Sequence, residues 1–475
     1  MIFRCFRLTA PDAPAACATR YLSLPLLLAV LAPDALAFTL GDPLDTDTVT
    51  PPRPVLRVDG QVMPCRQPSP GTAYGLAQVV DLALCQNPTT REVWAATRVE
   101  AAQVGLAQGQ FLPLLDAAAT ASRLRSQAQT TSRRSADVGF SWLLFDFGAR
   151  SANLEAARQT LAAAVSTLDG TVQTVFLAAV EAYYQAQAAR AAVVAASESE
   201  RASRESLTAA EVRYRVGTAT PADRLQAQTA WSQATLTRIR AEGVSRNALG
   251  RLANVMGLDA NHPVVLDDPP AREPNSGFES DVAALIAEAR QRRPELKAAE
   301  ADVKAAEANI DYALASGLPT LSVNALRQWQ DPALVSGQNA SIGLTLSVPI
   351  FSGFNTLYSV RAARARRDVS RERLDNVRLQ VALDVWQAYQ NLQTATQTTR
   401  TSTDLLASAE QSERVALGRY KAGVGTILDV LNAQSALANA RLQRIQATLD
   451  WQVSRATLAR SLGALDGSLL ETTLR

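Results

Sequence analysis

Apolar and polar side chains alternate one by one in two stretches of the chain. Over residues 341–350 the even positions are apolar, whereas the odd positions are Ser, Gly, Thr or Pro. Residues 136–144 alternate in the same way, with Trp142 on the apolar side and Asp137 on the polar side. This pattern is typical of a strand with one apolar and one polar face. It predicts strands at about residues 111–124 and 135–146, and a second pair later in the chain.

Long segments have instead the apolar period of a helix. From Leu374 to Leu392, six apolar residues advance with a mean spacing of 3.6, which places one apolar stripe on a helix. No proline lies between Pro113 and Pro221, and none follows Pro349, so helices can continue there without interruption. We therefore predict helices at residues 88–110, 148–215 and 221–255, and a second set that includes 354–421.

The two kinds of element suggest different surroundings. Arg, Glu and Gln recur along the helices, and no stretch after residue 37 is apolar for 18 residues, so we expect the helices to pack on one another in water. The strands, of about 10–12 residues, have the length and alternation of strands that cross an outer membrane; a hairpin in a soluble core is the alternative. Four strands cannot close a barrel alone, so two chains would supply eight strands or three chains twelve.

The chain contains a tandem duplication. Gly217 and Gly423 lie 206 positions apart, and the same offset relates Pro88 to Pro294 without a gap, so the repeat has to be settled before any local interpretation. We divide the chain into a signal peptide (1–37), an extended and weakly ordered Pro-rich arm (38–75), repeat one (76–257), a connector with a small helix at 280–292 (258–293), repeat two (294–465) and a tail (466–475).

Composition argues against chemistry on this chain. The formal net charge is +2 and there is a single histidine, His262, so neither a nucleic-acid partner nor a histidine metal site is indicated. Nucleotide-binding and nucleophile-elbow motifs are absent from the sequence. We expect no enzyme activity, no catalytic residue, no metal and no cofactor.

The first 37 residues resemble a secretory signal. An apolar run from Tyr21 to Ala32 follows several arginines and precedes Ala35-Leu36-Ala37, which predicts export and cleavage after Ala37. The mature chain would keep Cys65 and Cys85. In an oxidising compartment these two can form a disulfide, and two separate thiols are the alternative.

One motif, Tyr-x-x-Gly-x-x-Thr-x-x-Asp, occurs at both predicted helical turns. Glycine ends a helix in the left-handed conformation, threonine caps the next helix, and an aspartate three residues later lies near the positive end of its dipole. Helix capping therefore accounts for the motif without any transport role. Its capping residues are Gly217, Thr220 and Asp223 in the first turn and Gly423, Thr426 and Asp429 in the second, which also has Gly425.

The chain resembles the TolC-like outer-membrane efflux proteins. The resemblance rests on two repeats of strands and long helices, on this motif at both turns, and on the residues where strand meets helix, Leu144-Phe145-Asp146-Phe147-Gly148. Within that family the chain is most similar to the export components for cyclolysin, an adenylate cyclase-haemolysin. The resemblance implies an α+β membrane protein that forms a homotrimer, with a shared 12-stranded barrel in the outer membrane and a periplasmic helical tunnel.

The resemblance also implies a gate at the tunnel entrance. Asp223, Tyr420 and Asp429 match family positions that hold the entrance shut and set its preference for cations. Two positions differ from the best-known member: Gly425 replaces a gate arginine, and Asn432 replaces a second aspartate. We therefore expect a gate with fewer polar contacts that hold the entrance shut, and with a weaker ring of carboxylates.

The function implied is a passive exit duct for a type I protein (toxin) secretion system. Its partners would be a periplasmic adaptor (membrane fusion) protein, an inner-membrane ABC transporter, outer-membrane lipid and an exported protein. The alternatives are the outer-membrane channel of a multidrug or metal efflux pump, and a periplasmic coiled-coil scaffold that transports nothing.

Overall fold

The computed structural model describes residues 41–55, 57–58, 61–62, 65, 73–126, 129–267, 282–332 and 337–465. The predicted signal peptide, the predicted tail and part of the connector lie outside these residues. The chain divides into a first unit that ends at Asp45 and a second that begins at Thr46. The elements below belong to the second unit.

Both repeats contain six elements in the same order. Repeat one consists of α2 (Leu76–Gln86), α3 (Pro88–Gly109), β3 (Leu114–Ser126), β4 (Gln129–Phe145), α4 (Ala149–Arg215) and α5 (Pro221–Val255). Repeat two consists of α6 (Val282–Arg292), α7 (Pro294–Ala315), β5 (Thr320–Pro332), β6 (Gly337–Ser347), α8 (Asn355–Lys421) and α9 (Ile427–Ser461).

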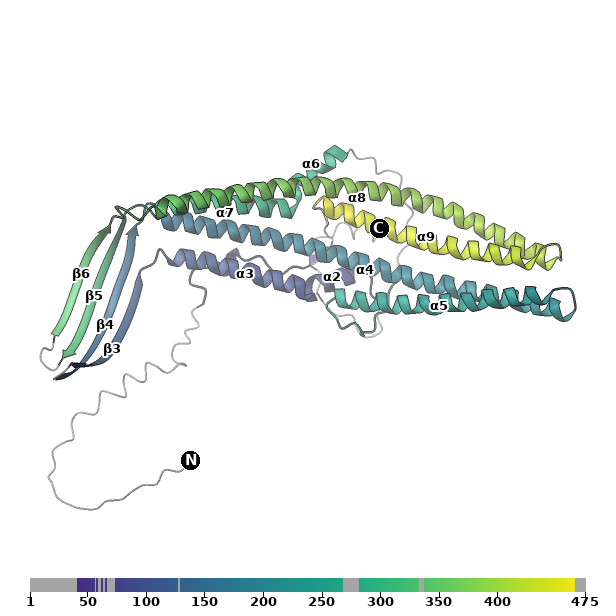
Figure 1. The fold of residues 1–475 in the computed structure, drawn as a ribbon, viewed down its shortest axis with the longest axis horizontal. Coiled ribbons are helices and arrows are strands. Elements are labelled where there is room, and N and C mark those ends of the chain that lie inside the picture. The colour runs from purple at the N-terminus through teal and green to yellow at the C-terminus, as the bar shows by residue number, and fades with distance from the viewer. Residues whose placement is uncertain are drawn as a thin grey trace, which may run out of the picture. The chain divides into compact units, whose positions relative to one another are not determined.

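The two long helices, α4 and α8, have 67 residues each, as the absence of proline predicts. Shorter helices accompany them: α3 and α5 pack along α4, whereas α7 and α9 pack along α8 (Figure 1). Repeats one and two are joined because α4 also packs against α7 and α9.

The apolar character of α4 exceeds our expectation. It contains an 18-residue window with a mean hydropathy of 1.3, long and apolar enough to cross a membrane, and 44% of that window is buried inside the protein. Eight of the 20 buried residues of α4 are alanines, and the helix contacts α3, α5, α7 and α9. Alanine permits close approach of helices, so we attribute the apolar window to this packing.

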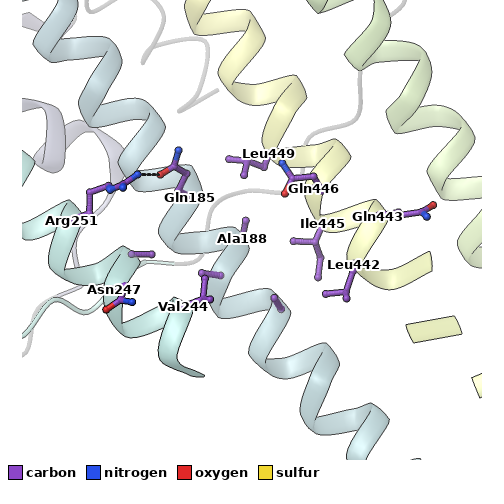
Figure 2. Close-up of a pocket in the computed structure, with 13 residues that line it drawn as sticks. Gln185, Ala188, Val244, Asn247, Arg251, Leu442, Gln443, Ile445, Gln446 and Leu449 are labelled. Atoms are coloured by element: carbon purple, nitrogen blue, oxygen red, sulfur yellow. Dashed lines mark hydrogen bonds between the residues drawn. The ribbon is translucent and has the colours of Figure 1, made fainter. Parts of the chain in front are cut away.

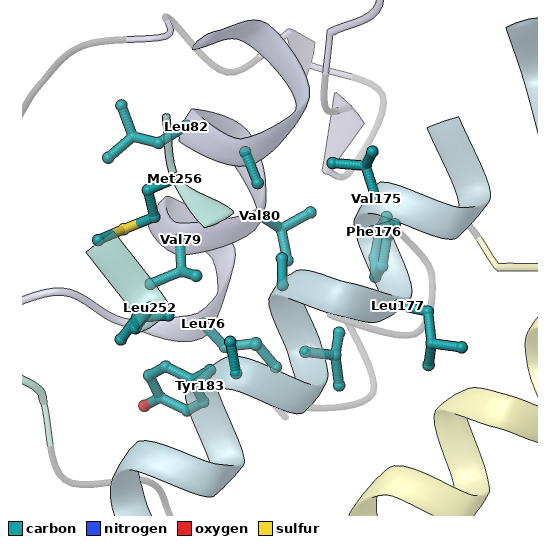
Figure 3. Close-up of a cluster of buried hydrophobic side chains, with 14 of the residues drawn as sticks. Leu76, Val79, Val80, Leu82, Val175, Phe176, Leu177, Tyr183, Leu252 and Met256 are labelled. Atoms are coloured by element: carbon teal, nitrogen blue, oxygen red, sulfur yellow. The ribbon is translucent and has the colours of Figure 1, made fainter. Parts of the chain in front are cut away.

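The largest core lies where α2, α4 and the end of α5 meet (Figure 3). Val79 and Val80 of α2 pack there against Phe176 of α4 and Leu252 of α5, and all four are at most 2% exposed. Full burial of such side chains stabilises by about 1.5–3 kcal/mol each. The sequence analysis did not predict α2, although this helix is at the centre of the core.

The four long strands form one antiparallel sheet in the order β3-β4-β5-β6. The register aligns Leu115, Phe140, Ala325 and Ile342 in one row, and Trp142, Val323 and Leu344 in another. Because neighbours within a row share one face of a sheet, the apolar residues of both repeats lie on the same face. That face is uncovered: Ile342 is 81% exposed and Leu344 is 64% exposed.

The arm is more structured than predicted. It contains a 3-10 turn, η3 (Thr46–Val49), and a short hairpin of β1 (Arg57–Val58) and β2 (Gln61–Val62). The indole Nε1 of Trp94 donates a hydrogen bond of 3.0 Å to the carbonyl of Pro51. These contacts hold the arm against α3, which low hydrophobic periodicity could not reveal.

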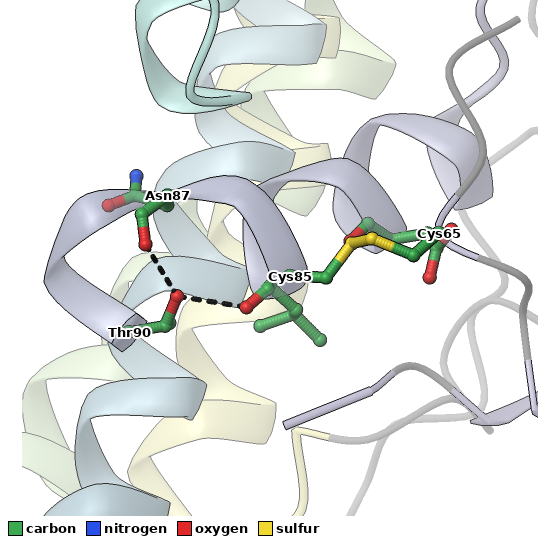
Figure 4. Close-up of a disulfide and its surroundings, with 6 residues drawn as sticks. Cys65, Cys85, Asn87 and Thr90 are labelled. Carbon is green, nitrogen blue, oxygen red and sulfur yellow. Dashed lines mark hydrogen bonds between the residues drawn. A yellow bond between two sulfur atoms is a disulfide. The ribbon is translucent and has the colours of Figure 1, made fainter. Parts of the chain in front are cut away.

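Cys65 and Cys85 are joined by a disulfide (Figure 4). Of the two possibilities left by the sequence, the structure therefore has the paired one. The bond attaches the arm to α2, where Thr90 Oγ1 donates hydrogen bonds to the carbonyls of Leu84 and Asn87 at the step from α2 to α3.

Candidate gate at the helix tips

The first turn joins α4 to α5 with the predicted capping chemistry. Gly217 has a φ of 78°, in the left-handed region. The Thr220 hydroxyl accepts from the backbone N–H of Asp223 at 3.2 Å, and the Asp223 carboxylate accepts from the N–H of Thr220 at 2.8 Å. This reciprocal pair is a capping box.

The second turn joins α8 to α9 in the same way. Gly423 has a φ of 81°, and the Asp429 carboxylate accepts from the N–H of Thr426 at 3.1 Å. Bonds from the Thr426 backbone and then from its hydroxyl lower the pKa of Asp429. In the single chain, the bonds of the capping box therefore favour the charged form of this carboxylate.

Gly425 meets its neighbours closely within the second turn. A Cβ at this position would lie 3.1 Å from the Cβ of Arg419 and 3.1 Å from the backbone nitrogen of Tyr420. The equivalent residue of the first turn is Ala219. Because Gly425 has no side chain, the turn can lie closer to Arg419 and Tyr420 at the end of α8 than it could with a larger residue.

Tyr420, predicted as a residue that holds the entrance shut, is buried at the contact between the two repeats. It is 4% exposed and belongs to a cluster with Leu207, Ala227 and Val430, which come from α4, α5 and α9. Its hydroxyl has no hydrogen-bond partner among the described residues. By this packing, Tyr420 holds the helical hairpin α8–α9 against the helical hairpin α4–α5.

Arg213, which the sequence analysis missed, is the partner of Tyr420. Its guanidinium lies over the tyrosine ring, 4.2 Å from the centroid, and donates to the Tyr420 carbonyl. Cation–π contacts of this kind stabilise by about 0.5–2 kcal/mol. The recurrence of Arg213 as Arg419 in the repeat is the sequence signal that could have drawn attention to it.

A buried polar pair adds to this contact between hairpins. Gln434 of α9 donates from Nε2 to the Ser206 hydroxyl of α4 at 3.0 Å, and both residues are at most 8% exposed. Because a buried amide needs partners, this bond fixes how the two hairpins align. It was also not predicted.

The remaining gate candidates lie on the surface of a single chain. Asp429 and Asn432 are exposed, and Asp223 is half-buried. No hydrogen bond joins Asp223 to Asp429 among the residues that the structure describes. The carboxylate ring predicted at the tips thus stays a prediction about assembled chains.

A groove of about 760 Å³ lies farther along the helices, between α4, α5 and α9 (Figure 2). Ala188 of α4, Val244 of α5 and Ile445 of α9 give it an apolar lining. Amides line it as well, among them Gln185, whose Oε1 accepts from Arg251 at 3.5 Å. Small apolar side chains and amides make a surface that suits another helix.

Comparisons with known proteins agree with this arrangement. The family model "Outer membrane efflux protein" matches residues 79–258 and 285–464, two segments with the same offset as the repeat. Protein CyaE of Bordetella pertussis is 33% identical, over 94% of this chain and 96% of that protein. The alkaline protease secretion protein AprF of Pseudomonas aeruginosa is 26% identical over 63% of each chain. The solved outer membrane channel CmeC of Campylobacter jejuni has a TM-score of 0.73 at 17% identity, over 84% of this chain and 89% of that chain.

Paired helical hairpins with capped tips, together with an uncovered apolar sheet, define an outer-membrane protein with a periplasmic helical part. Outer-membrane efflux, the role for which the matching family model is named, is a transport role. The chain belongs to the outer membrane efflux protein family.

Proposed function

We propose that this chain is the outer-membrane exit duct of a type I protein secretion system. Three copies would form one 12-stranded barrel in the outer membrane and a helical tunnel in the periplasm. The observation that carries the proposal is the four-stranded sheet with an uncovered apolar face and edges at β3 and β6.

The sheet supports assembly through its edges. Unpaired backbone groups in lipid cost several kcal/mol each, so a sheet in a membrane has to close on itself. Within the described part of the chain, no further strand pairs with β3 or β6. A neighbouring copy offers the complementary edge, and three copies of four strands fit a barrel of twelve.

Energy would come from an inner-membrane ABC transporter, linked through a periplasmic adaptor. The 33% identity with Protein CyaE over nearly the whole chain and the secretion role named for AprF favour a protein as cargo. The groove between α4, α5 and α9 is the place where we expect a helical hairpin of the adaptor to dock.

Protein export is the readout that separates this proposal from its rivals. We would delete the gene in its native host and measure the cell-free amount of the candidate type I substrate and the susceptibility to drugs and metals. Loss of secretion with unchanged susceptibility is expected. Normal secretion with increased susceptibility would instead favour multidrug or metal efflux. A protein that stays in the soluble periplasmic fraction would favour a scaffold.

The gate proposal has its own test in planar lipid bilayers. Asp429→Ala should reduce cation selectivity and block by multivalent cations, because the carboxylates of three copies would form a ring that attracts cations. Asp223→Ala tests the first turn in the same way. Asp450→Ala is the matched control, because it removes an exposed aspartate of the same helix, α9, about 30 Å farther from the tip at 1.5 Å per residue. Unchanged selectivity in both variants of the turns would contradict the ring.

A further inference from the structure

The apolar face of the four-stranded sheet becomes basic at the end that lies away from the helices. All four strands join helices at one end, and the hairpins β3–β4 and β5–β6 turn at the other (Figure 1). Near these turns lie Arg134 of β4 and Arg123 and Arg125 of β3. Arg134 shares the apolar face because it is six positions, an even number, from Phe140. The register places Arg123 and Arg125 on that face as well. We call these three residues the arginine patch.

The arginines of the patch are close enough to repel one another. Arg123 and Arg125 are two positions apart on β3, which is about 7 Å along a strand. Arg134 is the diagonal neighbour of Arg123 on β4, at about 7–8 Å. All three are exposed, and none forms an ion pair within the part of the chain that the structure describes. Like charges so close together destabilise a sheet, unless an anion lies between them.

The fold itself does not need these charges. Repeat two forms equivalent strands without them, so the patch belongs to repeat one alone. The equivalents of Arg123, Arg125 and Arg134 are Trp329, Asp331 and Ala340. The acid among these, Asp331, lies opposite Arg134 in the register. One acid against three arginines leaves the patch with an excess of positive charge.

The height of the patch along the strands matches the outer surface of a bilayer. Leu144 and Arg134 lie ten residues apart on β4, which is about 34 Å along a strand. At a tilt of about 40° this length spans about 26 Å across the membrane, close to the apolar band of about 25 Å in outer-membrane barrels. With Leu144 at the periplasmic boundary, next to the helices, Arg134 falls at the boundary that faces the outside.

Two residues of β5 mark the same boundary. Trp329 lies in the row of Ala136, next to that of Arg134, and tryptophans are typical of the girdles at membrane interfaces. Arg327 lies one row nearer to the helices. Its guanidinium is 5.4 Å from the centroid of the Trp329 ring and donates to Gln338 at 3.1 Å. Both partners are farther from the helices than Arg327, so this side chain extends from the apolar band toward the outer boundary.

We propose that the arginine patch binds the phosphate groups of an anionic lipid in the outer leaflet of the outer membrane. The inference rests on the proposed function, because it requires the sheet to cross that membrane with the helices on the periplasmic side. Guanidinium groups bind phosphate oxygens through pairs of parallel hydrogen bonds. A lipid can also place its acyl chains on the neighbouring apolar rows, which offer nothing to a soluble anion. The proposed trimer would carry three such lipid sites.

The test measures the binding of fluorescently labelled lipid A, which carries two phosphates, to the full-length protein in a neutral detergent. The double variant Arg123→Gln, Arg134→Gln should bind about tenfold more weakly, because hydrogen bonds between charged groups are lost. Arg133→Gln is the matched control, since Arg133 lies beside Arg134 on β4 but on the other face of the sheet. Its affinity should stay within about twofold of the wild type. Arg125→Gln alone, which should weaken binding about threefold, replaces the double variant if that variant does not form oligomers.

Two further ligands identify what the patch recognises. Dephosphorylated lipid A should bind the wild type and the double variant equally. An excess of inorganic phosphate should leave the labelled lipid bound, and its displacement would show a site for free phosphate and overturn the inference. Equal affinity of wild type and patch variants for lipid A, in oligomers that export protein, would overturn the inference and leave the proposed function standing. Lipid binding as expected in a wild type that exports no protein would instead overturn the secretion role.

Discussion

Asp146 and Ser352 occupy equivalent positions, where β4 and β6 lead into the two long helices. In repeat one, the buried carboxylate of Asp146 pairs with Arg150 Nε at 3.0 Å, and Arg150 also donates to the carbonyls of Gln110 and Leu144. In repeat two, Ser352 and Thr356 share one hydrogen bond of 3.4 Å between exposed or half-buried hydroxyls. A buried ion pair thus holds the first junction, whereas one hydrogen bond between hydroxyl groups holds the second.

The backbone at these junctions is nevertheless similar. Phe147 and Gly148 have φ values of 50° and 94°, and Gly353 and Phe354 have 62° and 63°. Phe111 stacks on Arg150 in repeat one, whereas its equivalent Gly317 leaves room for Thr356 in repeat two. Duplication has therefore kept the conformation that joins sheet to helix, while the side chains that hold it have changed together.

The largest difference is expected from Arg150→Ala. This change leaves the Asp146 carboxylate, which is 7% exposed, without its partner, and breaking a buried ion pair costs about 3–5 kcal/mol. Denaturant unfolding of the purified protein should show this loss. Thr356→Ala, the matched change in repeat two, should cost less than about 1 kcal/mol. Equal losses would remove the contrast between the junctions.

The disulfide distinguishes the repeats a second time, because α2 is fastened to the arm whereas Gln291 replaces the cysteine at the equivalent place of α6. Cys85→Ser should lower stability by about 3 kcal/mol, the value expected for a loop of this length. Limited proteolysis and thermal unfolding would measure the effect. Chemical reduction of the wild type should reproduce it, and should leave the Cys85→Ser variant unchanged.

Acid should weaken the first junction selectively. Burial acts to raise the pKa of Asp146, but hydrogen bonds from the Arg150 backbone and guanidinium and the charge of Arg150 outweigh it, so the folded-state pKa is below the usual 3.8. The ion pair therefore contributes its full stability above pH 4 and loses it as the pH falls through the folded pKa. The stability difference between wild type and Asp146→Asn should shrink in that range. A constant difference from pH 7 to pH 2 would contradict this assignment.

The smallest effect is expected from Gly425→Ala at the second tip. The added Cβ would be tight against Arg419 and Tyr420, which costs energy, whereas replacing glycine restricts the unfolded chain and recovers about 0.4–1 kcal/mol. Ala219 at the same place of the first turn shows that the motif accommodates alanine. We expect a net change within about 1 kcal/mol in thermal unfolding. A loss above about 2 kcal/mol would show that the two turns differ in backbone.

Helices, strands and turns could be predicted because their signals are local. The absence of proline and the apolar period located α4 and α8 to within one residue, and glycine, threonine and aspartate at fixed spacing specified both capping boxes. Because each pattern occurs in both repeats, the prediction for one repeat supported the prediction for the other. Only α2, which has no marked boundary signal before Leu76, was missed among the helices of repeat one.

The contacts between elements could not be predicted, because they depend on how segments far apart in sequence meet. Tyr420 was predicted as a gate residue from its place in the motif, but its contacts with Leu207 of α4 and with Arg213, 207 positions away, were not. The pairing of Gln434 with Ser206 spans 228 positions. Neither partner stands out by residue type, so only the assembled hairpins reveal them.

The uncovered sheet limits the order in which the protein can mature. A newly exported chain exposes an apolar strand face, which is unfavourable in water, and two sheet edges with unpaired backbone groups, which are unfavourable in lipid. A single folded subunit is therefore unfavourable both in water and in the membrane. In the proposed trimer, insertion and association would therefore be coupled into one step, whose rate would rise steeply with subunit concentration. Chains produced faster than they meet one another would depend on periplasmic chaperones to avoid edge-to-edge aggregation.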